Sequence, residues 1–148
     1  MKILVLNGPN LNLLGQRDRN VYGYETLEDV KNLLSEHFSD IDFIFLQSNH
    51  EGDLIDAIQS ARTDTIDALI ANWGGFTHTS VAIHDALELL TIPKVEVHIS
   101  NIHAREEFRE RSVTGKAMNG IITGFGTYSY VLGVKAALQL LSKKIIRE

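Results

Sequence analysis

The sequence alternates short apolar runs with stretches that carry apolar residues at helical spacing, and no other feature limits the fold as much. Each run has the length of a strand and is rich in Ile, Val, Leu and Phe. The runs are Ile3–Leu6, Ile41–Leu46, Ala68–Ala71, Val95–Ile99 and Ile121–Phe125. Strands that alternate with helices are joined by right-handed crossovers and form a parallel sheet.

The intervening stretches supply the helices of this pattern. Apolar residues fall on one helical face within residues 27–34, 54–58, 81–90 and 131–145. A chain of 148 residues is too short for a (β/α)₈ barrel, which normally needs about 250 residues. We therefore predict an α/β fold with a flavodoxin-like, doubly wound sheet of five parallel strands in the order 2-1-3-4-5. A single domain should span residues 1–148.

Composition excludes several functional classes. The formal net charge is -5, whereas nucleic-acid binding needs clustered Lys and Arg. The chain has no cysteine, which removes thiolate nucleophiles and thiolate metal sites. The N-terminal MKILVLNGPN reads as a first strand and not as a signal peptide, and no apolar run approaches the roughly 20 residues of a membrane span. We expect a cytoplasmic protein with a small-molecule ligand and neither a nucleic-acid nor a membrane partner.

Polar residues follow the first, third and fourth predicted strands, at residues 7–12, 72–79 and 98–103. Ligands of doubly wound folds bind outside the carboxyl ends of the strands, where strand order reverses. The order 2-1-3-4-5 makes these three strands neighbours, so their polar loops should converge. The long loop GQRDRNVYGYE, Gly15–Glu25, follows the first strand and has the length of a functional lid.

These loops hold several candidates for chemistry. NWGGFTHTS offers Asn72, His78 and free backbone amides that suit an anion, although a well-capped helix start also explains its Gly and Thr residues. His98, a histidine at a strand end, is a plausible acid or base. An equal alternative is a structural histidine that is buried and makes its hydrogen bonds within the protein. The lid arginines and tyrosines are either solvated or functional. A tyrosine hydroxyl becomes a base near neutral pH only beside positive charge.

Metal and nucleotide sites are not expected. None of the six histidines forms an HExxH pair. GFGTYS has Ser129 at the third glycine position of a dinucleotide fingerprint, and no later strand could supply the ribose carboxylate. We therefore predict neither a metal nor a cofactor.

Taken together, the motifs resemble type II 3-dehydroquinate dehydratase almost end to end. The resemblance is carried by LNGPNLNLLG followed by an arginine and VYG, by QSNHEGDLID, by GGFTHTSVAIHDAL, by EVHISNIHAREEFRERS and by GFGTYSYVL. These blocks occur in the family's order and at close to its spacing. The resemblance implies a flavodoxin-like enzyme without cofactor that removes water from 3-dehydroquinate through an enolate, giving 3-dehydroshikimate for aromatic amino-acid biosynthesis in the shikimate pathway.

The resemblance also implies roles for individual residues. The catalytic set is Tyr22 as the base, Arg17 to hold it as tyrosinate, His98 as the proton donor and Asn12 beside the enolate. Glu96 would orient His98. The lysines stand at strand starts, on helices or in a loop and never at a strand's carboxyl end, which suits a route without a Schiff base.

Substrate binding and assembly follow from the same resemblance. Asn72, His78 and Arg109 would bind the substrate hydroxyls, and the backbone amides of Ile99 and Ser100 its carboxylate. Asp85 would reach into a neighbouring subunit's site within a trimer, and the trimers would assemble into a dodecamer.

Three positions depart from the family pattern. Arg19 stands where a proline is common, which should loosen the lid and lets Arg19 compete with Arg17 for Tyr22 or Asp18. Trp73 replaces a small residue or proline, and Ser129 a common glycine. The alternatives to an enzyme are a flavodoxin-like module that binds a small anion without turnover and a flavin or nucleotide carrier.

Overall fold

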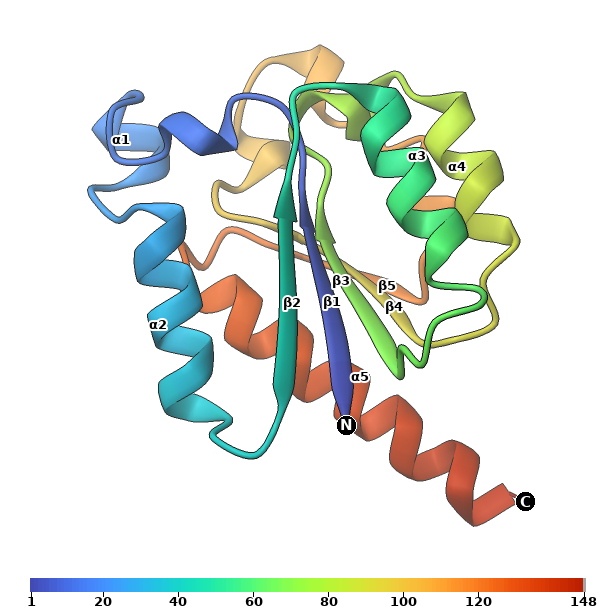
Figure 1. Cartoon of the computed structure of the whole chain (residues 1–148). Coiled ribbons are helices and arrows are strands. Elements are labelled where there is room, and N and C mark those ends of the chain that lie inside the picture. The colour runs from blue at the N-terminus through green and yellow to red at the C-terminus, as the bar shows by residue number, and fades with distance from the viewer. Residues whose placement is uncertain (148) are drawn as a thin grey trace.

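The computed structural model describes the backbone of residues 1–147 and the side chains of residues 1–144. Residue 148 of the predicted domain and the side chain of Ile145 in its last predicted helix lie outside this description. The parallel strands of the sheet run in the order β2-β1-β3-β4-β5, which confirms the predicted topology (Figure 1). They are β1 (Lys2–Asn7), β2 (Asp42–Gln47), β3 (Ala68–Asn72), β4 (Lys94–His98) and β5 (Gly120–Thr123).

All the predicted helices are present, and a short one lies in the lid. The helices are α1 (Arg19–Tyr22), α2 (Leu27–His37), α3 (Glu51–Ser60), α4 (Val81–Glu88) and α5 (Tyr128–Arg147). Short 3-10 turns connect the strands to the helices or to one another: η1 (Leu11–Leu13), η2 (Gly74–His78), η3 (Ile102–Ala104), η4 (Glu107–Arg109) and η5 (Gly115–Ala117). Side chains fix the helix starts, since Thr26 and Asp29 form a capping box on α2 and Ser80 caps α4.

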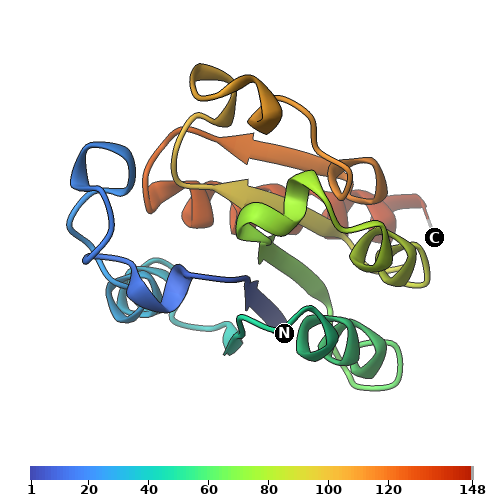
Figure 2. The same cartoon turned by 90° about the horizontal axis from the view of Figure 1, so that it is seen from above.

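Helices cover both faces of the sheet (Figures 1 and 2). Helices α2 and α5 pack on a face that contributes Val5, Ile70 and Val97 to the core. Helices α3 and α4 pack on the opposite face, which contributes Leu69 and Ala71. The central strands are therefore buried on both faces, as parallel strands in this class of fold usually are.

Trp73 follows β3 directly and is fully buried among the apolar side chains beneath α3 and α4. Its indole Nε1 has no hydrogen-bond partner among the described residues. The loop after β1 passes close to it, because a Cβ added at Gly8 would lie 2.3 Å from the Trp73 carbonyl oxygen. The core thus accommodates the bulk of Trp73, while Gly8 lets the loops after β1 and β3 meet.

None of the helices that the structure describes is long and apolar enough to cross a membrane.

Candidate active site

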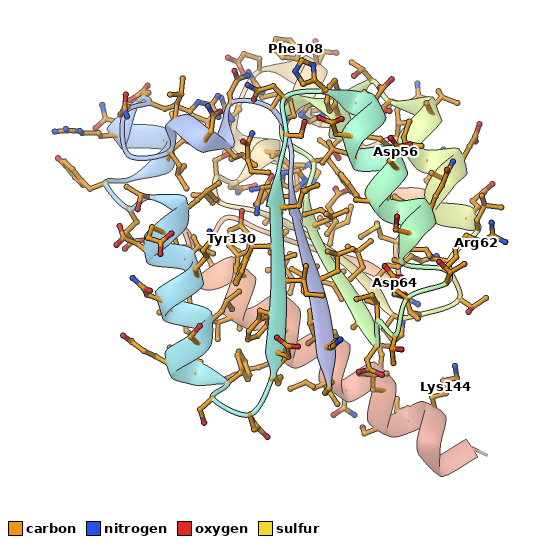
Figure 3. All side chains as sticks on the ribbon, in the orientation of Figure 1. Asp56, Arg62, Asp64, Phe108, Tyr130 and Lys144 are labelled. Atoms are coloured by element: carbon orange, nitrogen blue, oxygen red, sulfur yellow. The ribbon has the colours of Figure 1, made fainter. Side chains whose placement is uncertain are left out.

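A pocket opens at the carboxyl ends of β1, β3 and β4, where the sequence predicted that the polar loops converge. Phe108 marks this end of the molecule, while Lys144 lies towards the opposite end (Figure 3). Loops after these strands, the lid and the chain between η3 and η4 all contribute to its wall. The lining residues are Pro9, Asn10, Leu11, Arg17, Tyr22, Asn72, Gly74, Gly75, His78, His98, Ile99, Ser100, Ile102, Arg105 and Arg109.

Beneath the pocket, Asn72 is held by a buried hydrogen-bond chain. Its Nδ2 donates to the Tyr130 hydroxyl (3.1 Å), which donates in turn to Asn7 Oδ1 (2.6 Å). Its Oδ1 accepts from the Gly74 amide (3.1 Å). Burial raises the pKa of Tyr130 well above its usual range, so this phenol stays neutral and keeps its proton for Asn7. The amide of Asn72 is therefore fixed in one orientation, with a second N–H left for a ligand.

The lid carries a tyrosine beside two arginines. Arg17 Nη2 donates to the Tyr22 hydroxyl (2.9 Å), and the Arg17 guanidinium carbon lies 3.9 Å from the centre of the ring. The guanidinium carbon of Arg105 lies 5.2 Å from the same centre, and Arg105 Nη1 donates to Ser100 Oγ (3.2 Å). Two positive groups flank this phenol, which is the electrostatic condition for its use as a base.

Arg19 does not share in this cluster. As the first residue of α1 it projects towards Tyr24, and its guanidinium carbon lies 4.8 Å from the centre of that ring. Asp18 caps α1 by accepting from the Asn20 amide (3.0 Å). The structure thus separates the two arginine–tyrosine pairs of the lid, with Arg17 on Tyr22 and Arg19 on Tyr24.

His98 ends β4 and is paired with a buried carboxylate. Its Nε2 lies 2.9 Å from Glu96 Oε2, and both side chains are buried. Because the carboxylate can only accept, Nε2 donates and Nδ1 remains for a ligand in the pocket. Burial alone would raise the pKa of Glu96. The hydrogen bond and charge of His98, with the hydroxyls of Thr114 and Thr77, outweigh burial and hold that pKa below its usual value.

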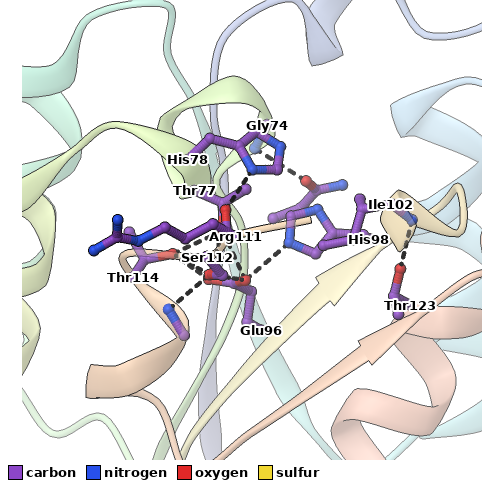
Figure 4. A network of polar contacts seen from close by, with 12 residues as sticks. Gly74, Thr77, His78, Glu96, His98, Ile102, Arg111, Ser112, Thr114 and Thr123 are labelled. Carbon is purple, nitrogen blue, oxygen red and sulfur yellow. Dashed lines mark hydrogen bonds and ion pairs between the residues drawn. The ribbon is translucent and has the colours of Figure 1, made fainter. Parts of the chain in front are cut away.

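His78 faces the pocket from the end of η2. Its Nδ1 lies 2.8 Å from the Arg111 carbonyl oxygen, to which it must donate, so Nε2 is the nitrogen left for a ligand (Figure 4). This contact fixes both the ring and its tautomer.

The turn after β4 is fixed by Thr123 of the neighbouring strand. Its hydroxyl donates to the Ser100 carbonyl (2.8 Å) and accepts from the Ile102 amide (3.2 Å). This holds Ile99 and Ser100 at the pocket wall. Arg109 reaches the pocket from η4, and its Nε donates to Glu106 (2.6 Å).

The predicted site residues fall into two groups. Two of them are exposed and do not line the pocket: Asn12 in η1 and Asp85 on α4. The other eight line it together: Arg17, Tyr22, Asn72, His78, His98, Ile99, Ser100 and Arg109.

The role of Asn12 stays a prediction, and the pocket lining does not include this residue. Asn10 lines the pocket instead, with a left-handed φ of 69° and its amide bonded to Asn49 Oδ1 (2.9 Å). Asparagine tolerates this conformation better than most residues do. The chain turns there into η1, which carries Asn12 away from the pocket.

Sequence reasoning also missed Arg105. It belongs to the charged run AREEFRER, whose pattern does not separate an arginine in a site from one on a solvated surface. Only the fold brings it to Tyr22.

A group of possible metal ligands occurs among the described residues of α4, away from the pocket: His84, Asp85 and Glu88. Both ring nitrogens of His84 already have partners, since Nδ1 lies 2.8 Å from the Val113 carbonyl and Nε2 lies 3.1 Å from Glu88.

Comparison with known proteins gives concordant matches. A family model described as dehydroquinase class II matches residues 1–138. A 3-dehydroquinate dehydratase of Caldicellulosiruptor bescii is 51% identical over 142 residues, covering 95% of this chain and 98% of the relative.

Two solved structures are also similar. The type II dehydroquinase of Butyrivibrio crossotus superimposes with a TM-score of 0.90 at 47% identity, covering 93% of this chain and 97% of that one. That of Propionibacterium acnes gives 0.87 at 39% identity, with 95% and 96% coverage.

Proposed function

The chain belongs to the dehydroquinase class II family, and on that premise we propose that it is a 3-dehydroquinate dehydratase. It would remove water from 3-dehydroquinate by anti elimination to give 3-dehydroshikimate, within the shikimate pathway. The observation that carries the proposal is one pocket lined by Tyr22, flanked by two guanidinium groups, and by His98, backed by Glu96. This pocket pairs a candidate base with a candidate acid, as an elimination requires.

The first step forms an enolate. The ionised oxygen of Tyr22 takes a proton from the carbon beside the substrate's ketone, and the electrons of the broken C–H bond move onto the ketone oxygen. Arg17 and Arg105 stabilise the phenolate before transfer, because their positive charges lie against the ring. We propose Asn10, which lines the pocket where Asn12 does not, as the amide beside the enolate.

The second step expels water. The enolate electrons re-form the ketone and make the new C=C bond, while the tertiary C–O bond breaks. His98 gives its Nδ1 proton to the departing hydroxyl, which leaves as water. Tyr22 then returns a proton to solvent and His98 takes one up, so the cycle closes without net change in the enzyme.

Substrate binding uses the polar groups that line the pocket around Tyr22 and His98. Asn72, His78 and Arg109 hold the substrate hydroxyls, and the amides of Ile99 and Ser100 hold its carboxylate. We also propose a cytoplasmic enzyme built of trimers that form a dodecamer, in which Asp85, exposed on α4, completes a neighbouring subunit's site.

The direct test is a spectroscopic assay of Tyr22→Phe. The wild-type protein should convert 3-dehydroquinate to a product with enone absorbance. Tyr22→Phe should lower kcat by at least about a thousandfold, a loss within the range for removal of a general base, while calorimetry still detects product binding. Wild-type turnover with an equally active Tyr22→Phe would reject Tyr22 as the base. Binding of 3-dehydroquinate to wild type without conversion would support the non-catalytic module instead.

A further inference from the structure

Three hydroxyl groups surround the carboxylate of Glu96 (Figure 4). Thr77 Oγ1 donates to Oε2 (2.9 Å), Ser112 Oγ lies 3.2 Å from the same oxygen, and Thr114 Oγ1 donates to Oε1. The hydroxyls also contact one another, with Thr77 Oγ1 2.8 Å from Ser112 Oγ and 2.9 Å from Thr114 Oγ1. We name Thr77, Ser112 and Thr114 the hydroxyl cluster.

The hydroxyl cluster and His98 make four hydrogen-bond contacts with Glu96, three at Oε2 and one at Oε1. A carboxylate has about four lone-pair sites, and these groups offer it four donors. Glu96 is fully buried and contacts neither Lys nor Arg among the described ion pairs. A buried carboxylate without such hydrogen bonds would take up a proton and become neutral. The hydroxyl cluster thus stabilises the negative charge of Glu96, as a paired arginine would stabilise another buried carboxylate.

We propose that the hydroxyl cluster keeps the proton shared by Glu96 and His98 on His98, so that Thr77, Ser112 and Thr114 are positioning residues for the acid of the reaction. The proposal rests on the function proposed above. The shared proton can reside on His98 or on Glu96, and its location changes the ability of His98 to act as an acid. His98 lines the pocket and can pass a proton to a ligand, whereas Glu96 does not line it. With the shared proton on Glu96, His98 is a neutral imidazole, and its Nδ1 is a far weaker acid towards the ligand than the Nδ1 of an imidazolium.

The backbone holds the cluster in place. The amide of Val113 donates to the Thr77 carbonyl (2.7 Å), and the Gly115 amide donates to Ser112 Oγ (2.9 Å). The rings of His78 and His84 also bond to this segment, through the carbonyl oxygens of Arg111 and Val113 respectively. Removing the Thr114 hydroxyl therefore changes the donors to Glu96 while these anchors remain.

Other ionisable groups lie near the Glu96–His98 pair and can contribute to the pH dependence of kcat. His84 contacts the segment from α4, where it also pairs with Glu88. Those that line the pocket with His98 are Arg17, Tyr22, His78, Arg105 and Arg109. The hydrogen bonds described for these residues do not include one to Glu96. A change confined to the hydroxyl cluster should therefore act on the Glu96–His98 pair first.

The test compares Thr114→Val, which keeps the shape and removes the donor, with Thr114→Ser, which keeps the donor. The control is Thr63→Val, whose hydroxyl donates to the exposed Ser60 carbonyl (3.2 Å). Loss of a hydrogen bond to a charged group corresponds to roughly a tenfold effect or more. Thr114→Val should lower kcat by about that factor and leave KM unchanged, because Thr114 does not line the pocket.

Two further readouts separate proton placement from a structural role. With fewer donors the pair holds its proton to higher pH, so the basic limb of the kcat profile of Thr114→Val should move upward. Infrared spectra of Thr114→Val should gain a protonated-carboxyl stretch, lost again when Glu96→Gln is added. Thr114→Ser should retain most of the wild-type kcat, and Thr63→Val should match wild type.

The proposal is overturned if Thr114→Val keeps the wild-type profile and gains no carboxyl band, or if Thr114→Ser is impaired as severely as Thr114→Val. Failure of the proposed function has a different signature, because the wild-type protein would then not convert 3-dehydroquinate. The infrared band tests where the proton lies even in that case, since it needs no turnover.

Discussion

Arg105 places a second positive charge against Tyr22 and also bonds to Ser100 at the pocket wall. Replacing it with Gln should lower kcat by roughly tenfold or more, because a positive group nearby favours the ionised form of a phenol. KM should change less, since Arg17 and the other pocket residues remain. Arg19→Gln is the matched control, since Arg19 lies over Tyr24. Steady-state kinetics check both, and equal effects would contradict the distinction between the two arginines.

At the scale of single residues, the sequence indicates which loops carry the chemistry better than which side chains perform it. Asn72 and His98 end strands and His78 follows one, so topology alone brings them together. Choosing Arg17 over Arg19 needed the resemblance to a family, because both flank the same turn. Asn10 was missed since its left-handed backbone, which decides what faces the pocket, has no pattern in the sequence.

At the scale of elements, the lid contains Arg19 at the position where the family commonly has proline, and this difference can be tested. Arg19 begins α1, a position that suits proline, and its amide is not among the described donors of the lid. Asp18 before it has a φ of -53° and a ψ of 108°, which is outside the α region that a following proline disfavours. Arg19→Pro should therefore keep activity, stabilise the protein by about 0.4–1 kcal/mol and slow proteolysis within the lid.

Thermal unfolding and limited proteolysis measure these changes. Arg19→Ala removes the contact with Tyr24 without restricting the backbone, and it should be no more resistant to protease than the wild type. A less stable Arg19→Pro would show that the lid needs a freer backbone at this residue.

Elements with apolar periodicity were predictable, and the short connecting turns were not. Three-residue segments such as η1 and η3 are too short to show a period. The last strand was predicted as Ile121–Phe125, whereas β5 ends at Thr123, because Gly124 and Gly126 adopt positive φ angles of 102° and 61°. These glycines turn the chain towards α5, which therefore begins before the first apolar residue of its predicted stretch.

At the scale of the whole molecule, exposed Asp85 tests the proposed assembly. Tyr22→Phe and Asp85→Asn should each have low activity alone. If each site combines Tyr22 of one subunit with Asp85 of its neighbour, subunit exchange in an equal mixture should restore roughly a quarter of the sites. Kinetics after partial unfolding and reassembly would measure this. Glu88→Gln, on the same helix, should behave as wild type, and no recovery in verified mixed oligomers would place Asp85 outside the site.

The bond from Tyr130 to Asn7 and Asn72 joins the ends of the first and third strands to the last helix. A chain leaving the ribosome completes both strands long before Tyr130 is synthesised. Until then Asn7 and Asn72 lack the phenol that joins them in the folded protein. The hydrogen bonds that orient Asn72 beneath the pocket can therefore be complete only after the start of α5 has been synthesised.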